Sequence, residues 1–276
     1  MRTEHTLNAA VARLSIVMGL LYGGCGISAL AADSEADIAK QLNNPIADLI
    51  SVPFQGNYDK DIGPTRQGER YLLNIQPVIP FHISEDWNLI SRTILPVTRL
   101  EDVPPGNNEQ GIGDITQSLF FSPRALQDGW TWGAGPALLL RTTTDELLGS
   151  EKWAAGPTAV ALKQEHGWTY GALVNHLWSY AGNGQATDVD ATYLQPFFGY
   201  TTAMHTSYFI NTESTYDWVG NDWSVPLNIS VSQVFKIGKQ PMSIQLGARY
   251  WADTPQGAGP EGWGARLTYT LVFPKS

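Results

Sequence analysis

The stretch WGARLTYTLVF, residues 263–273, alternates between apolar side chains and small or polar ones. Its odd-numbered positions hold Trp, Ala, Leu, Tyr, Leu and Phe, whereas positions 264, 266, 268 and 270 hold Gly, Arg, Thr and Thr. A period of two places these two sets on opposite faces of a β-strand. Residues 71–83 and 224–236 follow the same rule. The pattern therefore predicts long strands that meet an apolar medium on one face and a polar one on the other.

Outward from this stretch, the same alternation recurs along the chain, and no convincing amphipathic helix follows residue 46. The length of each segment is close to that of a tilted strand that crosses a bilayer, about 9–11 residues. It is about twice the usual length of a strand in a soluble protein. The twelve segments are 46–58, 71–83, 87–97, 113–123, 130–141, 153–163, 168–180, 191–201, 207–217, 224–236, 241–252 and 263–273.

The connections between these segments alternate in length. Short ones lie at 84–86, 124–129, 164–167, 202–206 and 237–240, longer ones at 59–70, 98–112, 142–152, 181–190 and 253–262, and one of moderate length at 218–223. Short turns on one side and long loops on the other are typical of outer-membrane barrels, in which closure pairs every backbone group away from lipid. The fold class predicted is all-β: a single up-and-down antiparallel transmembrane barrel of about 12 strands, with short periplasmic turns and long extracellular loops.

Aromatic residues recur near the ends of the predicted strands, as they do at the two interfaces of a membrane. The alternative is that they are ordinary core aromatics of a soluble β-protein. The residues expected at one height are Trp87, Trp130, Trp168 and Tyr208, and those near the opposite edge are Trp153, Tyr180, Tyr193, Tyr216, Tyr250 and Trp263.

Composition excludes several other classes of protein. The net charge of −9 argues against a nucleic-acid partner, because such proteins carry a basic face to meet phosphates. Only 43% of residues are hydrophobic and the mean hydropathy is −0.17, which argues against a bundle of membrane helices. The single cysteine rules out an intrachain disulfide and a cysteine-based zinc site. We expect no cofactor and no metal cluster.

The first 31 residues read as a signal peptide. Arg2 and Arg13 precede a compact apolar run at 14–22, and Ala29-Leu30-Ala31 has the small-residue pattern of a cleavage site. An uncleaved membrane anchor is the alternative. The predicted parts are a signal peptide (1–31), a periplasmic segment that forms a tail or a small plug (32–45), the transmembrane barrel (46–273) and a C-terminal tail (274–276).

These parts predict export to the outer membrane of a gram-negative cell. The expected partners are outer-membrane lipids and lipopolysaccharide, a small-molecule solute, and the barrel-assembly machinery during insertion. The predicted long loops, which include Asp59 and Arg70, are strongly acidic. They form either a solvated face or a surface that binds divalent cations beside lipopolysaccharide or steers cationic solutes.

Charged residues inside the strands indicate where solutes are selected. An arginine that faces lipid at mid-membrane costs roughly 2–4 kcal/mol, so such residues are expected to face the lumen. We predict a charged constriction that binds the solute; the alternative is an ion-pair network that only satisfies buried charges. The residues are Arg92, Asp114, Arg141, Glu213, Arg249 and Arg266, of which Asp114 and Arg141 are expected at the rim.

Four stretches resemble one outer-membrane family. They are LNNPIADLISVPFQ (42–55), LNIQPVIP (73–80), WNLISRTILPV (87–97) and GIGDITQSLFFSP (111–123), and the resemblance extends over about residues 42–273. The family is labelled as meta-pathway phenol-degradation proteins or simply as transporters. The resemblance implies a gram-negative outer-membrane barrel that takes up hydrophobic or aromatic compounds.

The predicted function is that of a porin-like channel for passive uptake of small solutes through a polar lumen, and not that of an enzyme. An outer-membrane hydrolase and a non-conducting structural barrel are the alternatives. His82, His166, His176 and His205 are the candidate bases for a hydrolase. No Ser or Asp pairs with them at a spacing that indicates catalysis, so each histidine is expected to be structural.

Overall fold

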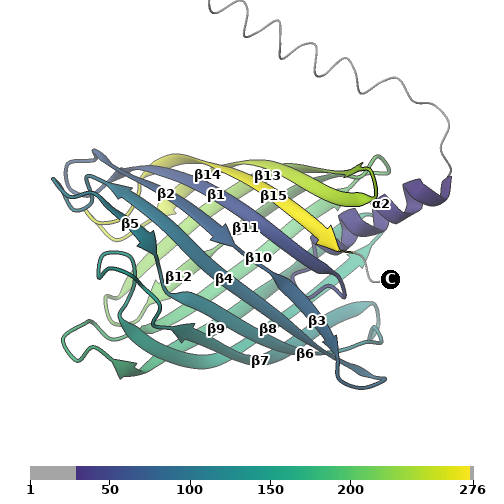
Figure 1. The fold of residues 1–276 in the computed structure, drawn as a ribbon, viewed down its shortest axis with the longest axis horizontal. Helices are drawn as coiled ribbons and strands as arrows, with labels where there is room; N and C mark the ends of the chain where they lie inside the picture. The colour runs from purple at the N-terminus through teal and green to yellow at the C-terminus, as the bar shows by residue number, and fades with distance from the viewer. Residues whose placement is uncertain (1–28, 274–276) are drawn as a thin grey trace, which may run out of the picture. The chain divides into compact units, whose positions relative to one another are not determined.

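The alternating stretch at the end of the chain forms strand β15 (Gly262–Phe273) of a closed β-barrel, shown in Figure 1. The computed structural model describes the backbone of residues 29–273 and the side chains of residues 35–273. All but the last three residues of the predicted signal peptide, and all of the tail 274–276, lie outside this range. Among the described residues no helix is long and apolar enough to cross a membrane.

Fifteen strand segments make up twelve barrel strands, because three barrel strands are interrupted. The pairs β2–β3, β5–β6 and β11–β12 each continue one barrel strand across a short break. The other elements are helix α2 (Ala29–Leu42) and the strands β1 (Ile50–Ile62), β2 (Gly68–Ile75), β3 (Val78–His82), β4 (Trp87–Glu101), β5 (Glu109–Ile112), β6 (Ile115–Pro123), β7 (Trp130–Leu140), β8 (Lys152–Glu165), β9 (Trp168–Gly182), β10 (Asp190–Thr201), β11 (Thr206–Thr212), β12 (Ser214–Asp217), β13 (Asp222–Ile237) and β14 (Gln240–Asp253).

The barrel closes between its first and last strands. β1 pairs with β15 in antiparallel register from Ile50↔Phe273 to Tyr58↔Ala265, and every other barrel strand pairs with its neighbours in the sequence. The described sheet therefore has no free edge, which is the condition for β-structure in lipid. This confirms the predicted all-β fold, the antiparallel order and the number of strands.

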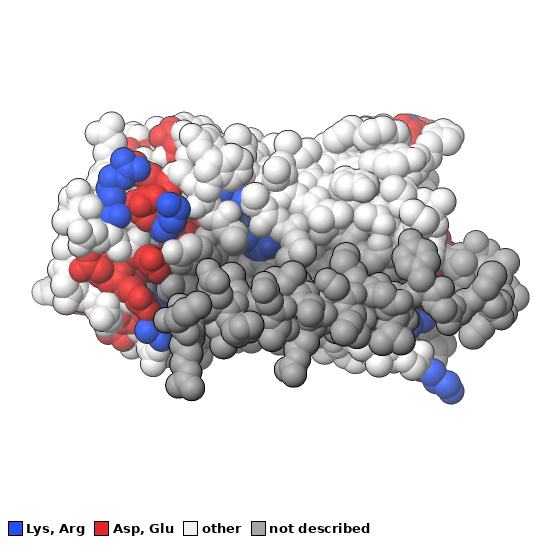
Figure 2. Space-filling view, turned by 90° about the horizontal axis from the view of Figure 1, so that it is seen from above, with Lys and Arg blue, Asp and Glu red and all other residues white. Residues whose placement is uncertain are grey.

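The two faces of the strands are divided as the sequence predicts. On β15, Leu267 is 51% exposed on the outer wall, whereas Thr268 next to it is 6% exposed in the interior. An apolar residue outside and a polar residue inside is the reverse of a soluble protein, and it is the arrangement of a barrel in lipid. In Figure 2 the visible charged residues gather mainly at the end on the left, and the adjoining wall is mostly uncharged.

The connections differ between the two ends of the barrel, which we call the long-loop end and the short-turn end. The long-loop end holds 102–108, 141–151, 183–189 and 254–261, and the short-turn end holds 83–86, 166–167, 202–205 and 238–239. In one of the two-residue turns, His166 and Gly167 both have positive φ, 50° and 84°. Two left-handed residues in succession match the twist of the strands that they join.

The predicted long loop 59–70 is wrong in its extent. β1 continues to Ile62 and β2 begins at Gly68, so only residues 63–67 connect them. Asp59 and Arg70 lie opposite each other in the ladder. Apolar alternation stops where the strands leave the apolar layer, but backbone pairing continues beyond it. The sequence pattern therefore underestimates the length of these strands.

Residues before β1 fill the barrel interior at its short-turn end. Ile38, Ala39, Ala47 and Leu49 form a buried cluster with Val234 and Val272 of the wall. Ile46 joins a second buried cluster, whose other members are Val78, Ile90, Phe120, Val160, Leu162, Leu173 and Phe197. We call residues 35–49 the inner segment. Burial of its apolar side chains against the wall holds the segment inside the barrel.

Candidate solute site in the barrel lumen

Glu213 is held between two arginines inside the barrel. Its carboxylate accepts two hydrogen bonds from Arg266, at 2.8 and 2.7 Å, and one from Arg249 at 2.9 Å. Glu213 occupies the break between β11 and β12, opposite Pro226 of β13, which has no N–H to donate. Arg249 and Arg266 are only 4% and 6% exposed. Buried guanidinium groups need such partners, because desolvating an unpaired charge is costly.

The ion-pair network extends toward the long-loop end. Asp59 is fully buried and bridges Arg70 at 2.9 Å and Arg249 at 3.5 Å, and it accepts a hydrogen bond from Trp251 Nε1 at 2.8 Å. Arg249 Nε also donates to Asn228 Oδ1 at 3.0 Å. Two strands near the start of the chain, β1 and β2, and two near its end, β13 and β14, therefore contribute to one network.

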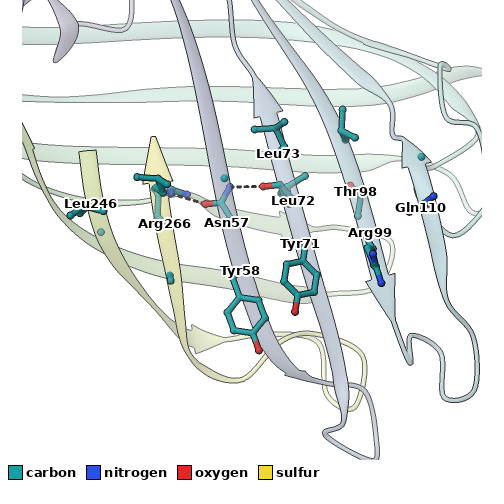
Figure 3. Close-up of a pocket in the computed structure, with 16 residues that line it drawn as sticks. Asn57, Tyr58, Tyr71, Leu72, Leu73, Thr98, Arg99, Gln110, Leu246 and Arg266 are labelled. Carbon is teal, nitrogen blue, oxygen red and sulfur yellow. Dashed lines mark hydrogen bonds between the residues drawn. The ribbon is translucent and has the colours of Figure 1, made fainter. Parts of the chain in front are cut away.

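Asn57 links this network to the barrel wall. Its Oδ1 accepts a hydrogen bond from Arg266 Nε at 2.7 Å, and its Nδ2 donates to the carbonyl oxygen of Leu72 at 3.5 Å. Figure 3 shows Asn57 between these two partners, while Tyr58 beside it turns to the other face of β1. The orientation of Arg266 is thus fixed from two sides, by Asn57 and by Glu213.

Sequence reasoning missed Asp59 and Arg70, which it assigned to a loop. A signal is present in the sequence: Asp59 continues the inward-facing series of Gln55 and Asn57 at every second position. Extending the period of two beyond the apolar residues places Asp59 in the lumen. The polarity of residues 59–61 concealed this continuation.

The structure brings four of the six predicted site residues together and places two elsewhere. Arg92 lines the same cavity as Glu213 and Arg266. Asp114 instead accepts hydrogen bonds from the backbone N–H groups of Thr142, Thr143 and Ser150, so it holds loop 141–151. Arg141 is exposed and contacts Glu151 at 3.3 Å. Asp114 and Arg141 therefore have their partners in loop 141–151, at the long-loop end.

A cavity of about 200 Å³ lies between the inner segment and the arginines. Arg92, Glu213 and Arg266 contribute the charged part of its lining. The rest of the lining is mixed, with apolar side chains such as Leu42, Val78 and Phe197. Its uncharged polar residues on the barrel wall include Gln55, Gln76, Gln195, Asn211, Asn228, Ser230, Ser232, Ser243, Gln245, Thr268 and Thr270. Such a surface can hydrogen-bond a small molecule from several directions.

Three polar atoms in this lining have no hydrogen-bond partner among the described residues. They are Asn211 Oδ1, Asn228 Nδ2 and Thr268 Oγ1. Asn228 and Thr268 are 4% and 6% exposed. Buried polar groups in proteins are nearly always satisfied, and leaving one unpaired costs about 1–3 kcal/mol. Arg92 is also poorly satisfied: of the described residues only Gln76 accepts a hydrogen bond from it, at 3.5 Å.

Polar contacts fasten the inner segment at the short-turn end. Asn43 Nδ2 donates to the hydroxyl oxygens of Thr201 and Ser207, each at 3.1 Å. Glu35 approaches His205 at 3.4 Å and Lys236 at 3.5 Å. The segment is therefore attached to turns and strands on one side of the barrel, in addition to its apolar packing.

The histidines have carboxylate neighbours that the sequence does not reveal. His82 lies 3.1 Å from Asp48, and His205 lies near Glu35 of the inner segment. His176 on β9 lies 3.0 Å from Asp190 and 2.7 Å from Thr192, both on β10. The sequence offers no spacing that pairs His176 with an Asp or a hydroxyl residue, and the structure supplies both. Pairing of adjacent strands brings residues together that are 14 and 16 positions apart.

Comparison with solved structures shows the fold of an outer-membrane barrel. The COG4313 outer membrane channel from Pseudomonas putida F1 is 16% identical with a TM-score of 0.64, over 82% of this chain and 96% of that chain. Outer membrane phospholipase A from Escherichia coli is 12% identical with a TM-score of 0.44, over 87% and 98%. OmpF from Salmonella typhi is 9% identical with a TM-score of 0.36, over 82% and 96%. The last two scores are too low to support an argument.

No model of a known protein family matches the sequence, and no curated protein matches it either. The likeness to the outer membrane channel concerns the fold and does not extend to a substrate. The resemblance to the meta-pathway phenol-degradation family therefore stays a prediction.

Proposed function

We propose that this chain forms an outer-membrane channel through which small polar solutes, preferentially anions, diffuse. The observation that carries the proposal is the polar lumen cavity beside Arg92, Glu213 and Arg266, with its unpartnered polar atoms. Polar side chains that the fold itself leaves unsatisfied favour a role in holding or passing a solute. The fold shared with an outer membrane channel supports the same assignment.

The charge of the lumen favours anions. The network contains four arginines (Arg70, Arg92, Arg249 and Arg266) and two carboxylates (Asp59 and Glu213), so bases exceed acids by two. Rings of arginine in a narrow, low-dielectric passage attract anions and repel cations. A purely structural network accounts for Arg70, Arg249 and Arg266, which are ion-paired, but leaves Arg92 without a role.

The lining also bears on the chemistry of the solute. Amide and hydroxyl groups line much of the cavity wall, so a solute that hydrogen-bonds gains more there than a hydrocarbon does. We therefore favour small carboxylates, whether aliphatic or aromatic, over the neutral hydrophobic compounds that the family resemblance implies.

The inner segment acts as the gate of this proposed channel. It lies between the cavity and the short-turn end, so a solute that crosses must pass beside it or displace it. Its polar fastening through Asn43 and Glu35 is a weaker hold than a continuous strand, which suits an element that moves. A barrel whose segment never moves corresponds to the non-conducting alternative.

Planar-bilayer recordings test the proposal. We expect the processed barrel to conduct, with a reversal potential in a salt gradient that indicates anion preference. Arg92→Gln should shift this potential toward cations, whereas Arg99→Gln, a matched change at an exposed arginine ion-paired with Glu101, should not. If neither the intact chain nor a variant without residues 35–45 conducts ions, the channel proposal is refuted.

A further inference from the structure

His176, Asp190 and Thr192 form a linked group on the outer wall of the barrel. His176 Nδ1 lies 2.7 Å from Thr192 Oγ1, and His176 Nε2 lies 3.0 Å from Asp190 Oδ1. His176 and Thr192 are directly paired across β9 and β10, and Asp190 shares a face with Thr192 two positions before it. Strand pairing thus places a hydroxyl beside one nitrogen of an imidazole and a carboxylate beside the other.

This group faces the membrane at the height of its outer interface. On β9, Val174 and Trp178 share the face of His176 and are 40% and 49% exposed, whereas Leu173 on the other face is buried. The His176 ring contacts the Trp178 ring, with centroids 4.0 Å apart. The surrounding aromatics at the long-loop end are Trp178, Tyr180, Tyr216, Trp218 and Trp223. Aromatic belts lie at headgroup level, where ester bonds join lipid headgroups to their acyl chains.

Trp218 and Asp190 favour one direction for these hydrogen bonds. Trp218 Nε1 lies 2.9 Å from Thr192 Oγ1, and an indole N–H can only donate, so the hydroxyl of Thr192 keeps its own proton to donate elsewhere. Asp190 Oδ1 lies 3.0 Å from His176 Nε2, and a proton on Nε2 is favoured because a lone pair there would face a carboxylate. In that neutral form Nδ1 is the acceptor, and Thr192 donates its O–H to it.

These are the relative roles of a nucleophile, a general base and an orienting carboxylate. His176 Nε2 and Asp190 Oδ1 are shielded from solvent and close, although they are not aligned as a hydrogen bond. Misalignment of this kind is common before substrate binds and does not exclude the role.

We propose that this group hydrolyses acyl esters of lipids in the outer leaflet, an activity separate from conduction through the lumen. Thr192 Oγ1 adds to the ester carbonyl carbon while His176 Nδ1 takes its proton, and Asp190 stabilises the imidazolium. Collapse of the adduct breaks the carbon–oxygen bond of the ester, and the His176 proton passes to the leaving alkoxide. Water, deprotonated by His176, then attacks the acyl-threonine; the fatty acid leaves and the proton returns to Thr192.

The site has one evident donor for the negative charge that develops on the carbonyl oxygen. Trp218 Nε1 lies beside the nucleophile and can move from Thr192 Oγ1 to that oxygen as the adduct forms. Removing one donor from a paired oxyanion site typically costs about 10²–10³-fold in rate. We therefore expect slow turnover. The secondary hydroxyl of threonine also slows the reaction, because its methyl group hinders attack on the ester.

The test uses the processed barrel in mixed micelles of detergent and phospholipid, with release of fatty acid as the readout. We expect the intact protein to release fatty acid above the protein-free rate, Thr192→Ser to retain or raise it, and Thr192→Val and His176→Asn to lower it at least 100-fold. Thr187→Val, at an exposed hydroxyl in the adjoining loop 183–189, is the control and should behave as the intact protein.

A second measurement distinguishes hydrolysis by this barrel from hydrolysis by a contaminating lipase. An alkyl fluorophosphonate should add to Thr192 of the intact protein, as mass spectrometry of the labelled peptide would show. Folding of each variant is checked by heat-modifiable migration, and its conductance should stay unchanged because none of the three residues lines the lumen cavity. The inference is overturned if a folded, conducting barrel hydrolyses no lipid, or if Thr192→Val and the intact protein release fatty acid at equal rates. Either result would leave the proposed channel function unaffected.

Discussion

Replacing Glu213 with glutamine should destabilise the barrel by about 3 kcal/mol. The carboxylate accepts three hydrogen bonds from Arg249 and Arg266, whose side chains are each 5% exposed. Removing one partner of a buried ion pair typically costs about 3–5 kcal/mol. The lower figure applies because Glu213 is itself 20% exposed and a glutamine oxygen can still accept a hydrogen bond.

Glu261→Gln is the matched control, with the same change in net charge. Its partner Arg66 lies 2.9 Å away, but both side chains are about half exposed, so the cost should be below about 1 kcal/mol. The assay is reversible urea unfolding in lipid vesicles, followed by tryptophan fluorescence. If Glu213→Gln lowers the free energy of unfolding no more than Glu261→Gln does, the arginines are not held by this carboxylate. The buried network would then need another explanation.

Three further predictions concern the inner segment and the long loops. Asn43→Ala should raise the open probability in bilayer recordings, because it removes two hydrogen bonds that hold the inner segment to Thr201 and Ser207; unchanged gating would contradict this. Asp114→Ala should make loop 141–151 more sensitive to limited proteolysis, since the carboxylate accepts several of its backbone N–H groups. Lys152 donates a hydrogen bond to Asp188, and this bond and the charge of Lys152 lower the pKa of Asp188. The stability that this ion pair contributes to loop 183–189 is therefore present above the unfolded pKa of about 3.9, and it is lost as the pH falls through the lower folded pKa. Proteolysis of that loop should therefore increase only below about pH 4, and Asp188→Asn should abolish the pH dependence.

The barrel itself could be predicted from the sequence because lipid imposes a strict rule on each strand. Every second residue of 263–273 must be compatible with hydrocarbon, and this requirement is visible without an alignment. Consecutive strands of a meander also become neighbours, so Arg249 and Arg266, on the last two strands, come close enough to share Glu213. The local rule and the simple topology together determine most of the architecture.

The contents of the lumen could not be predicted in the same way. Contacts across the barrel, such as Asp59 with Arg249, join strands through the interior, and no period in the sequence encodes them. The inner segment has few apolar residues at regular spacing, so its burial beside Val234 and Val272 leaves no clear pattern. The partners of His176 were missed because an exact register is needed to bring Asp190 and Thr192 against it.

The seam between β1 and β15 has a consequence for assembly. Its two strands are the first and the last of the barrel, so the cylinder cannot be completed until the ribosome has supplied the whole chain. The inner segment is covalently joined to the leading strand of that seam and comes to rest in the enclosed space. The inner segment must therefore enter before the final rows of hydrogen bonds between β1 and β15 form, or the short-turn end must stay wide enough to admit it afterwards.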